Sequence, residues 1–260
     1  MPELMAGRRV LITGVRNKWS IAWHAAQAVI REGAKVAFSV YGERELTALT
    51  KLLQELGEEA PVFECNMDED SQVDTLMSKV SDVFEGRLDG MLHAIAFANR
   101  EDLVGEFAAT SRAGFGLAHD RSVYSLVTLA RAARPLFQQE GGSIVTLSYL
   151  GAERVVPNYN VMGVAKAALE STVRYLAFDL GKENVRVNAV SAGPIKTLAA
   201  TGISNFDAMI KHVADSAPLR RGIDADEVGD AVMFLLSELA RGITGEVLHV
   251  DAGYNIVGTL

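Results

Sequence analysis

Short apolar runs rich in β-branched residues alternate along the chain with longer segments in which apolar residues recur at helical spacing. A continuous apolar run of this kind is typical of a strand buried on both faces of a parallel sheet. The runs predict strands over 9–14, 35–41, 61–65, 89–97, 142–149 and 185–192, and a seventh strand within 245–253.

The longer segments between these runs are predicted to be helices, including long apolar ones at about 115–138 and 159–180. In the segment 20–33, Ser20 can cap the start of the helix and Gly33 can end it. Alternating strands and helices require right-handed crossovers, which give a parallel sheet with helices on both faces. We predict an α/β fold: one Rossmann-type doubly wound domain over 1–260 with a seven-stranded parallel sheet. A TIM barrel, which needs eight evenly spaced units, is the weaker alternative.

Composition and charge narrow the function classes. With 260 residues, 49 % of them hydrophobic, the chain can bury a sizeable core. A net charge of -8 argues against a general nucleic-acid binder, which needs a dense basic face. Cys65 is the only cysteine, so an intrachain disulfide is impossible and a small core residue is expected there. His93, His119 and His249 have no partners at metal-ligand spacing, so no metal site is predicted.

The amino-terminal stretch reaches the first predicted strand without the apolar segment and cleavage site of a signal peptide. No apolar run approaches the roughly 18 residues that a membrane span needs. We therefore expect a soluble cytoplasmic protein with no membrane span.

The turn after the first predicted strand is a candidate phosphate site. In an open parallel sheet a dinucleotide lies beyond the carboxyl ends of the strands, with its pyrophosphate on the first helix. Gly14 permits a tight turn and a close backbone approach, and Ser20 offers a hydroxyl and an amide to a phosphate. This turn has one glycine where the usual fingerprint has three, so an ordinary capped turn is the alternative.

The ends of the next strands supply candidates for the adenosine half of a dinucleotide. Tyr41 ends the second strand, where the ribose would lie, and the nearby Arg44 is either a partner for a 2′-phosphate or a solvated side chain. Asn66, after the third strand, can accept a hydrogen bond from the adenine amino group. The small residues of 94–99 would let a ribose approach the backbone. The choice between NADH and NADPH stays open on these residues.

Tyr159 and Lys166 are seven residues apart in a segment predicted to be helical. Seven helical steps bring two residues to nearly the same azimuth, about 10 Å apart along the axis, so both side chains lie on one face. They can converge on one ligand, although this spacing alone does not make them catalytic.

Three stretches carry a family resemblance: SYLGAERVVPNYNVMGVAKAALE, VRVNAVSAGPIKTLAA and GITGEVLHVDAG. They resemble the bacterial NADH-dependent enoyl-[acyl-carrier-protein] reductases, a divergent branch of the short-chain dehydrogenase/reductases, and the likeness extends over essentially the whole chain. The Tyr-x6-Lys spacing after Ser-Tyr-Leu-Gly is the specific element. Ordinary members of the superfamily carry Tyr-x3-Lys, an upstream serine and three glycines in the first turn, all of which this sequence lacks.

The resemblance implies three catalytic candidates: Tyr159 near the substrate thioester carbonyl, Lys166 on the nicotinamide ribose and Tyr149 on the fatty-acyl side. It also implies cofactor contacts at Gly14, Ser20, Ile21, Asn66, Met67, Ile95, Ala96, Ile195 and Thr197, beside the Tyr41 noted above. Relatives commonly have Asp-Val in place of Asn66-Met67, and often glycine in place of Ala96. These departures put cofactor affinity in doubt rather than the type of reaction, because an amide still accepts a hydrogen bond but without charge assistance.

The implied reaction is reduction of the trans-2 double bond of an enoyl-acyl-carrier-protein thioester by NADH, with NADPH as the alternative, at the last step of the fatty acid elongation cycle. Hydride addition at the β carbon requires donors aimed at the developing enolate oxygen. Tyr159 supplies an O–H, and Lys166 supplies three N–H donors and a positive charge. We favour a hydrogen bond from Tyr159 over direct proton transfer, which stays an alternative.

The segment at about 194–215 is a candidate cover for the substrate. An acyl chain needs an apolar slot, and its candidate residues are Ala98, Leu103, Tyr149, Tyr159, Met162, Ala199, Phe206 and Met209. For the two methionines, a role in the helix core is the alternative.

The implied partner is an acidic acyl carrier protein, for which a basic patch at Lys196, Lys211, Arg220 and Arg221 is a weak candidate because acidic residues are interspersed. The long apolar helices and the resemblance suggest a homotetramer. A carbonyl reductase and a non-catalytic dinucleotide sensor are the rival functions; the x6 spacing argues against the first, and the retained Tyr159 and Lys166 argue against the second.

Overall fold

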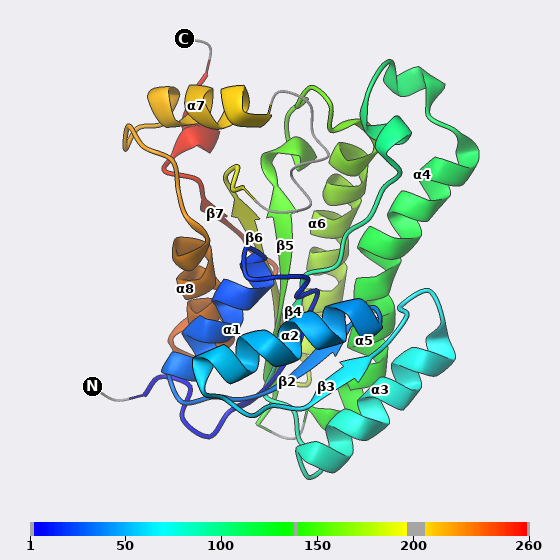
Figure 1. Ribbon diagram of the computed structural model, residues 1–260, viewed down its shortest axis with the longest axis vertical. Coiled ribbons are helices and arrows are strands. Elements are labelled where there is room, and N and C mark those ends of the chain that lie inside the picture. The colour runs from blue at the N-terminus through cyan, green and yellow to red at the C-terminus, as the bar shows by residue number, and fades with distance from the viewer. Residues whose placement is uncertain (1–2, 138–139, 197–205, 259–260) are drawn as a thin grey trace.

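Seven parallel strands form one sheet in the order β3-β2-β1-β4-β5-β6-β7 (Figure 1). The computed structural model describes residues 3–137, 140–196 and 206–258. The strands are β1 (Arg9–Thr13), β2 (Lys35–Val40), β3 (Val62–Glu64), β4 (Gly90–His93), β5 (Gly142–Tyr149), β6 (Val185–Ala192) and β7 (Val247–Val250). All seven predicted strands are present, which confirms the doubly wound α/β fold.

Helices cover both faces of the sheet (Figure 1). Alternate residues of each strand pack into two separate cores: on β1, Val10 and Ile12 face one core and Leu11 faces the other. Helices α1, α2 and α8 cover the first core, and α3, α5 and α6 cover the second. The helices are α1 (Ile21–Arg31), α2 (Glu43–Leu56), α3 (Asp70–Val83), α4 (Arg112–His119), α5 (Ser125–Ala133), α6 (Asn160–Gly181), α7 (Phe206–Ser216) and α8 (Ala225–Leu236). None of these described helices combines the length and apolarity needed to cross a bilayer.

The strand order reverses between β1 and β4, and this reversal creates the crevice in which doubly wound folds bind ligands. Gly14 follows β1 with φ of +82°, and a Cβ there would lie 2.1 Å from the carbonyl oxygen of Ala94. Only glycine allows the two chain segments to approach this closely.

Strand β4 ends at His93, four residues before the predicted end at 97. The Thr13 hydroxyl explains the early end, because it donates to the carbonyl of Leu92 at 3.0 Å and accepts from the amide of Ala94 at 3.2 Å. Beyond His93, the side chain of Thr13 therefore takes the place of backbone pairing between β1 and β4. The predicted strand was too long here because the segment after His93 is apolar but leaves the sheet to line a cavity.

Ser20 precedes α1 as predicted, but its side chain does not cap the helix. Its Oγ accepts hydrogen bonds from the amides of Arg16 and Asn17, both at 3.1 Å, and so stabilises the preceding turn. Ser20 is therefore the N-cap residue of α1, as predicted, but its side chain makes no hydrogen bond to the helix. Gly33 ends the helix as predicted, with φ of +89° two residues after Arg31.

The helix predicted at about 115–138 is interrupted. Between α4 and α5 the chain forms one π-helical turn, Asp120–Tyr124. A π turn inserts an extra residue into a helix and is found frequently at functional sites. Ser122 within this turn bonds the backbone of Phe97: its Oγ accepts from the amide at 3.0 Å and donates to the carbonyl at 3.2 Å.

Cys65 is a buried core residue, as expected, and His93 is buried as well. The two ring nitrogens of His93 lie 2.8 Å from Thr146 Oγ1 and 2.9 Å from Ser125 Oγ. Complete burial lowers the pKa of His93 to about 3, so the ring stays neutral. Burial raises the pKa of Cys65 to about 11, which disfavours the reactive thiolate.

Candidate active site

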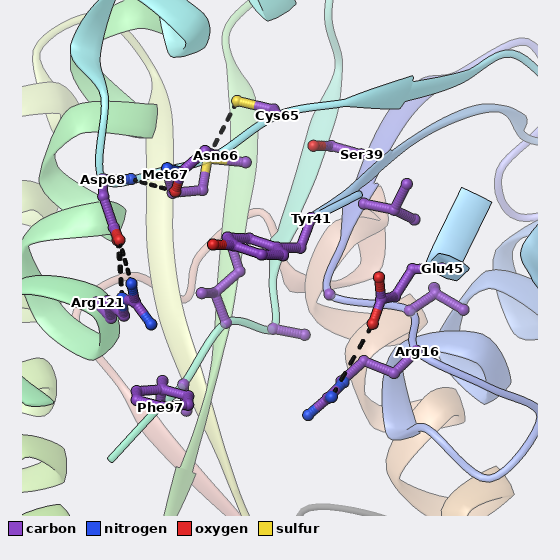
Figure 2. A pocket seen from close by; sticks show the side chains of 16 residues that line it. Arg16, Ser39, Tyr41, Glu45, Cys65, Asn66, Met67, Asp68, Phe97 and Arg121 are labelled. Carbon is purple, nitrogen blue, oxygen red and sulfur yellow. Dashed lines mark hydrogen bonds and ion pairs between the residues drawn. The ribbon is translucent and has the colours of Figure 1, made fainter. Parts of the chain in front are cut away.

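A cavity of about 250 Å³ lies at the carboxyl ends of β1, β2, β3 and β4 (Figure 2). This is the position that a doubly wound sheet offers to a dinucleotide. The residues around it are Gly14, Val15, Arg16, Ser39, Val40, Tyr41, Glu45, Cys65, Asn66, Met67, Asp68, Ala94, Ile95, Ala96, Phe97 and Arg121.

Many of the predicted cofactor residues meet at this cavity. The ones that line it are Gly14, Tyr41, Asn66, Met67, Ile95 and Ala96. They come from four different strand ends, so the fold brings together residues that are far apart in sequence.

Other predicted cofactor residues lie outside the lining of this cavity. Ile21 and Ile195 are partly buried and pack against the core under α1 and α8. Ser20 contributes to the turn that follows Gly14, and Lys166 lies on α6 beside β5. Thr197 is outside the described residues.

The side chain of Asn66 is partly committed to its own loop. Its Oδ1 accepts from the amide of Asp68 at 3.1 Å, and its Nδ2 donates to Glu69 at 3.3 Å. An amide oxygen has two lone pairs, so Oδ1 keeps capacity for one further hydrogen bond. Its expected role toward an adenine amino group is therefore compatible with the geometry.

Several residues of the cavity were not identified from the sequence. Arg44 is exposed and absent from the lining, whereas Glu45, one residue later, faces the cavity with Arg16 at 4.0 Å. Phe97 and Arg121 also line it. No sequence motif marks Arg121 as a cavity residue. It reaches the cavity only because the folded chain brings the π turn next to the end of β3.

The predicted catalytic residues lie together at the carboxyl end of β5. Tyr149 ends β5 and Tyr159 immediately precedes α6, and their rings meet edge to face with centroids 5.0 Å apart. Lys166 is buried on α6, and its Nζ donates to the carbonyl oxygen of Leu147 at 2.8 Å. Two of its three N–H donors are left for other acceptors.

Burial changes the acid–base properties of these three side chains. It raises the pKa of Tyr159 well above its ordinary value, and it raises the pKa of Tyr149 to about 12. Both phenols therefore stay protonated and can donate hydrogen bonds at neutral pH. Burial lowers the pKa of Lys166 to about 8, so its ammonium form survives at neutral pH but with a small margin.

Glu170 is a buried acidic group near Lys166. It lies one helical turn further along α6 and accepts a hydrogen bond from Ser148 Oγ at 2.5 Å. Burial raises the pKa of Glu170, while its negative charge raises the pKa of Lys166 against the larger effect of desolvation. Glu170 thus helps to keep Lys166 charged.

Several of the residues expected to hold an acyl chain pack together next to Tyr159. Ala98, Leu103 and Tyr159 pack against a small cluster that contains Met162, which is 5 % exposed. The hydroxyl of Tyr149 lies 3.5 Å from the sulfur of Met209 on α7. Ala199 and the side chain of Phe206 lie outside the described residues, as does much of the expected cover at 194–215.

The four basic residues considered for carrier-protein docking have partners within the chain. Lys196 pairs with Asp207, Lys211 with Asp215 and Arg221 with Glu227, and Arg220 donates to the carbonyl oxygen of Asp215. Carboxylates thus offset the charges of Lys196, Lys211 and Arg221, so the structure does not strengthen this patch as a docking surface.

Comparison with known proteins identifies the family. The family model described as enoyl-(acyl carrier protein) reductase matches residues 14–255. An NADH-dependent enoyl-[acyl-carrier-protein] reductase of Bacillus subtilis is 49 % identical over 253 residues, 97 % of each chain. The NADPH-dependent enzyme of Staphylococcus aureus is 47 % identical over 255 residues, 97 % of this chain and 98 % of that one. The crystal structure of the Bacillus cereus reductase with NADP+ and indole naphthyridinone is 48 % identical, covers 98 % of this chain and 99 % of that one, and has a TM-score of 0.95. The chain therefore belongs to the enoyl-[acyl-carrier-protein] reductase family.

Proposed function

We propose that this reductase uses Tyr159, Lys166 and Tyr149 to reduce the trans-2 double bond of enoyl thioesters on acyl carrier protein, with NADH as the hydride donor. The observation that carries the proposal is that these three side chains lie at the carboxyl end of β5, and that β5 pairs with β4, whose end lines the cavity. Relatives of nearly half identity over the whole chain share this activity by name, which supports the proposal.

The residues around the cavity suit a dinucleotide. The absence of a side chain at Gly14 lets the first turn lie against Ala94 at the cavity, beside the amino end of α1, where a pyrophosphate is favoured. The buried ammonium of Lys166 keeps two N–H donors for the hydroxyls of the nicotinamide ribose. NADH, when bound, supplies the hydride that adds to the β carbon of the substrate.

Tyr159 stabilises the negative charge that develops on the thioester oxygen during hydride addition. Its half-buried phenol has a raised pKa and stays neutral, so it donates an O–H hydrogen bond to the enolate. The positive charge of Lys166 favours the same charge development through the local field. The proton that completes the reaction adds to the α carbon.

Tyr149 and the cluster around Met162 form the acyl side of the proposed site. Ala98, Leu103 and Met162 offer apolar surface, and Met209 on α7 contacts the hydroxyl of Tyr149. We extend the proposal to the segment 194–215, which begins after β6 and includes most of α7, as a cover over the substrate.

NADH is the proposed cofactor, with NADPH as the alternative that some relatives use. Glu45 faces the cavity near Tyr41, where the adenosine ribose would lie, and its carboxylate would repel a 2′-phosphate. Arg16, 4.0 Å from Glu45, offsets part of this charge, so the expected preference is moderate.

The proposal also includes a homotetramer in the cytoplasm. Tyr175 and Phe178 on the outer face of α6 are 74 % and 85 % exposed, which is unfavourable for large aromatic side chains in a monomer. Packing of α6 against a second copy would cover them, and closed symmetric assemblies are the common outcome of such packing.

A substrate panel tests the proposed function. Oxidation of NADH and of NADPH is followed with crotonyl-coenzyme A, with an enoyl-acyl carrier protein and with a simple ketone. We expect turnover with both thioesters and a higher kcat/KM with NADH. Turnover with the ketone alone would indicate a carbonyl reductase, and binding of NADH without turnover of any of the three would indicate a dinucleotide sensor.

A further inference from the structure

An ion pair that the proposed mechanism does not use borders the cofactor cavity. Asp68 follows β3, Arg121 belongs to the π turn, and both side chains line the cavity (Figure 2). Nε of Arg121 donates to Oδ1 of Asp68 at 3.1 Å and to Oδ2 at 2.8 Å, and Nη2 donates to Oδ2 at 2.5 Å. This two-pronged contact fixes the plane of the guanidinium group.

The ring of Phe97 makes a second contact with the guanidinium group of Arg121. The guanidinium carbon lies 4.7 Å from the ring centroid of Phe97. Ser122, the next residue, bonds both backbone groups of Phe97 and so anchors the π turn to this segment. Three separate contacts therefore set the position of Arg121 at the cavity wall.

The expected path of the cofactor places Arg121 beside the adenine. By the rule for doubly wound folds, the pyrophosphate would lie at Gly14 and the ribose near Tyr41, after β2. From there the base must extend toward the end of β3, where Met67 and Asp68 line the cavity. Figure 2 shows the pair of Arg121 and Asp68 on one side of Tyr41, with the pair of Arg16 and Glu45 on the other.

We propose that Arg121, fixed by Asp68 and Phe97, is a cofactor-binding residue that contacts the adenine ring with the plane of its guanidinium group. This inference rests on the proposed NADH-dependent function and adds a residue to its cofactor site. A guanidinium plane is weakly hydrated and stacks well on aromatic faces, including those of nucleobases. Because Asp68 neutralises the charge, Arg121 provides a stacking surface rather than a second phosphate contact.

The chain contains a matched control for a purely structural role. Arg131 on α5 and Asp70 on α3 form an ion pair at 2.8 Å between the same two parts of the chain. Neither residue lines the cavity. Loss of the Arg131 pair removes a tether of the same kind without changing the cavity wall.

The test compares Arg121→Leu, Asp68→Asn and Arg131→Leu by fluorescence titration with NADH and by steady-state kinetics with crotonyl-coenzyme A. Arg121→Leu should raise the Kd for NADH about five- to tenfold, since stacking of this kind contributes measurably to binding of a base. Asp68→Asn should raise it by a smaller factor, because the guanidinium remains but is less fixed. Arg131→Leu should leave the Kd unchanged. In Arg131→Leu, kcat at saturating NADH should also be unchanged.

Reduced nicotinamide mononucleotide, which lacks the adenosine half, separates the adenine contact from a general disturbance. Its kcat/KM should be the same in Arg121→Leu and in the wild-type protein. An unchanged Kd for NADH in Arg121→Leu, an equal loss in Arg131→Leu, or an equal loss with the mononucleotide would overturn the adenine contact while leaving the reductase function intact. A wild-type protein that binds NADH at no concentration tested would overturn both.

Discussion

Tyr159 and Lys166 differ in what burial does to them, and their variants should differ accordingly. Tyr159→Phe removes one O–H from a site that otherwise keeps its shape, so kcat should fall by about 100-fold or more while the Kd for NADH stays normal. Lys166→Ala removes the donor expected on the ribose, so the Kd for NADH should rise. Both are measured by NADH titration and steady-state kinetics. An equal loss of NADH affinity in the two variants would contradict the assigned roles.

The depressed pKa of Lys166 gives the enzyme a predicted pH dependence. Its ordinary value of 10.5 falls to about 8 in the folded protein, so the folded protein loses this proton while an unfolded chain would still keep it. The buried charge thus costs stability below about pH 8, and the cost disappears as pH rises toward the ordinary value. Binding of NADH should show the opposite trend, because it needs the charged form of Lys166. Affinity for NADH should be constant below neutrality and should fall as pH rises through about 8.

Fluorescence titration of NADH between pH 6 and about 10 checks this dependence. Glu170→Gln removes the negative charge that supports Lys166, so the fall in affinity should move to lower pH. Lys166→Met should bind NADH weakly at every pH. A Lys166→Met variant that shows the same pH dependence as the wild-type protein would assign the titration to another group.

At the scale of elements, the turn between β1 and α1 depends on one glycine. A Cβ at Gly14 would lie 2.1 Å from a backbone oxygen, and φ of +82° is unfavourable for any other residue. Gly14→Ala should therefore lower the free energy of unfolding by roughly 3 kcal/mol or weaken NADH binding strongly through displacement of the turn.

Gly242→Ala is the matched control, because its Cβ would meet no atom within 4 Å and its φ is not positive. Thermal unfolding measures the stability of both variants, and titration with NADH measures their affinity; only Gly14→Ala should show a loss. A Gly14→Ala protein with normal stability and normal affinity would show that the close approach to Ala94 does not matter.

The pattern of apolar residues predicts elements well where periodicity alone sets the structure. All seven strands lie where apolar runs predict them, and Gly33 ends α1 through a positive φ that its residue type favours. The early end of β4 could not be predicted, because it depends on hydrogen bonds of Leu92 and Ala94 with the side chain of Thr13, about 80 positions away in the sequence. The π turn was missed for a similar reason: its bonds to Phe97 exist only in the folded chain.

The sequence predicts those residues of the candidate site that lie at strand ends, but not those that reach the cavity only through tertiary contacts. Strand ends are predictable positions, and Gly14, Tyr41 and Asn66, predicted from them as cofactor residues, line the cavity. Arg121 was missed because its helix carries no ligand motif and reaches the cavity only through the tertiary fold. Arg44 was considered for a phosphate, whereas its neighbour Glu45 faces the cavity, because a helix presents adjacent residues in different directions.

At the scale of the whole molecule, the exposed aromatic residues of α6 predict an assembly. Phe178→Glu places a charge on a side chain that is 85 % exposed in the single chain, so it should not affect the fold but should disrupt packing between copies. Light scattering should give a tetramer for the wild-type protein and a smaller species for this variant. Leu56→Glu, at an exposed position on α2, is the control and should leave the mass unchanged. A wild-type monomer would contradict the predicted assembly.

The central claim is that hydride passes to the β carbon of an enoyl thioester held between Tyr159 and the cofactor cavity. Its most direct test is turnover of crotonyl-coenzyme A with NADH that carries deuterium at the transferable position of the nicotinamide, followed by mass spectrometry and NMR of the product. The account predicts butyryl-coenzyme A with one deuterium on the β carbon and a solvent-derived proton on the α carbon. Deuterium on the α carbon, or no transfer to the thioester at all, would contradict it.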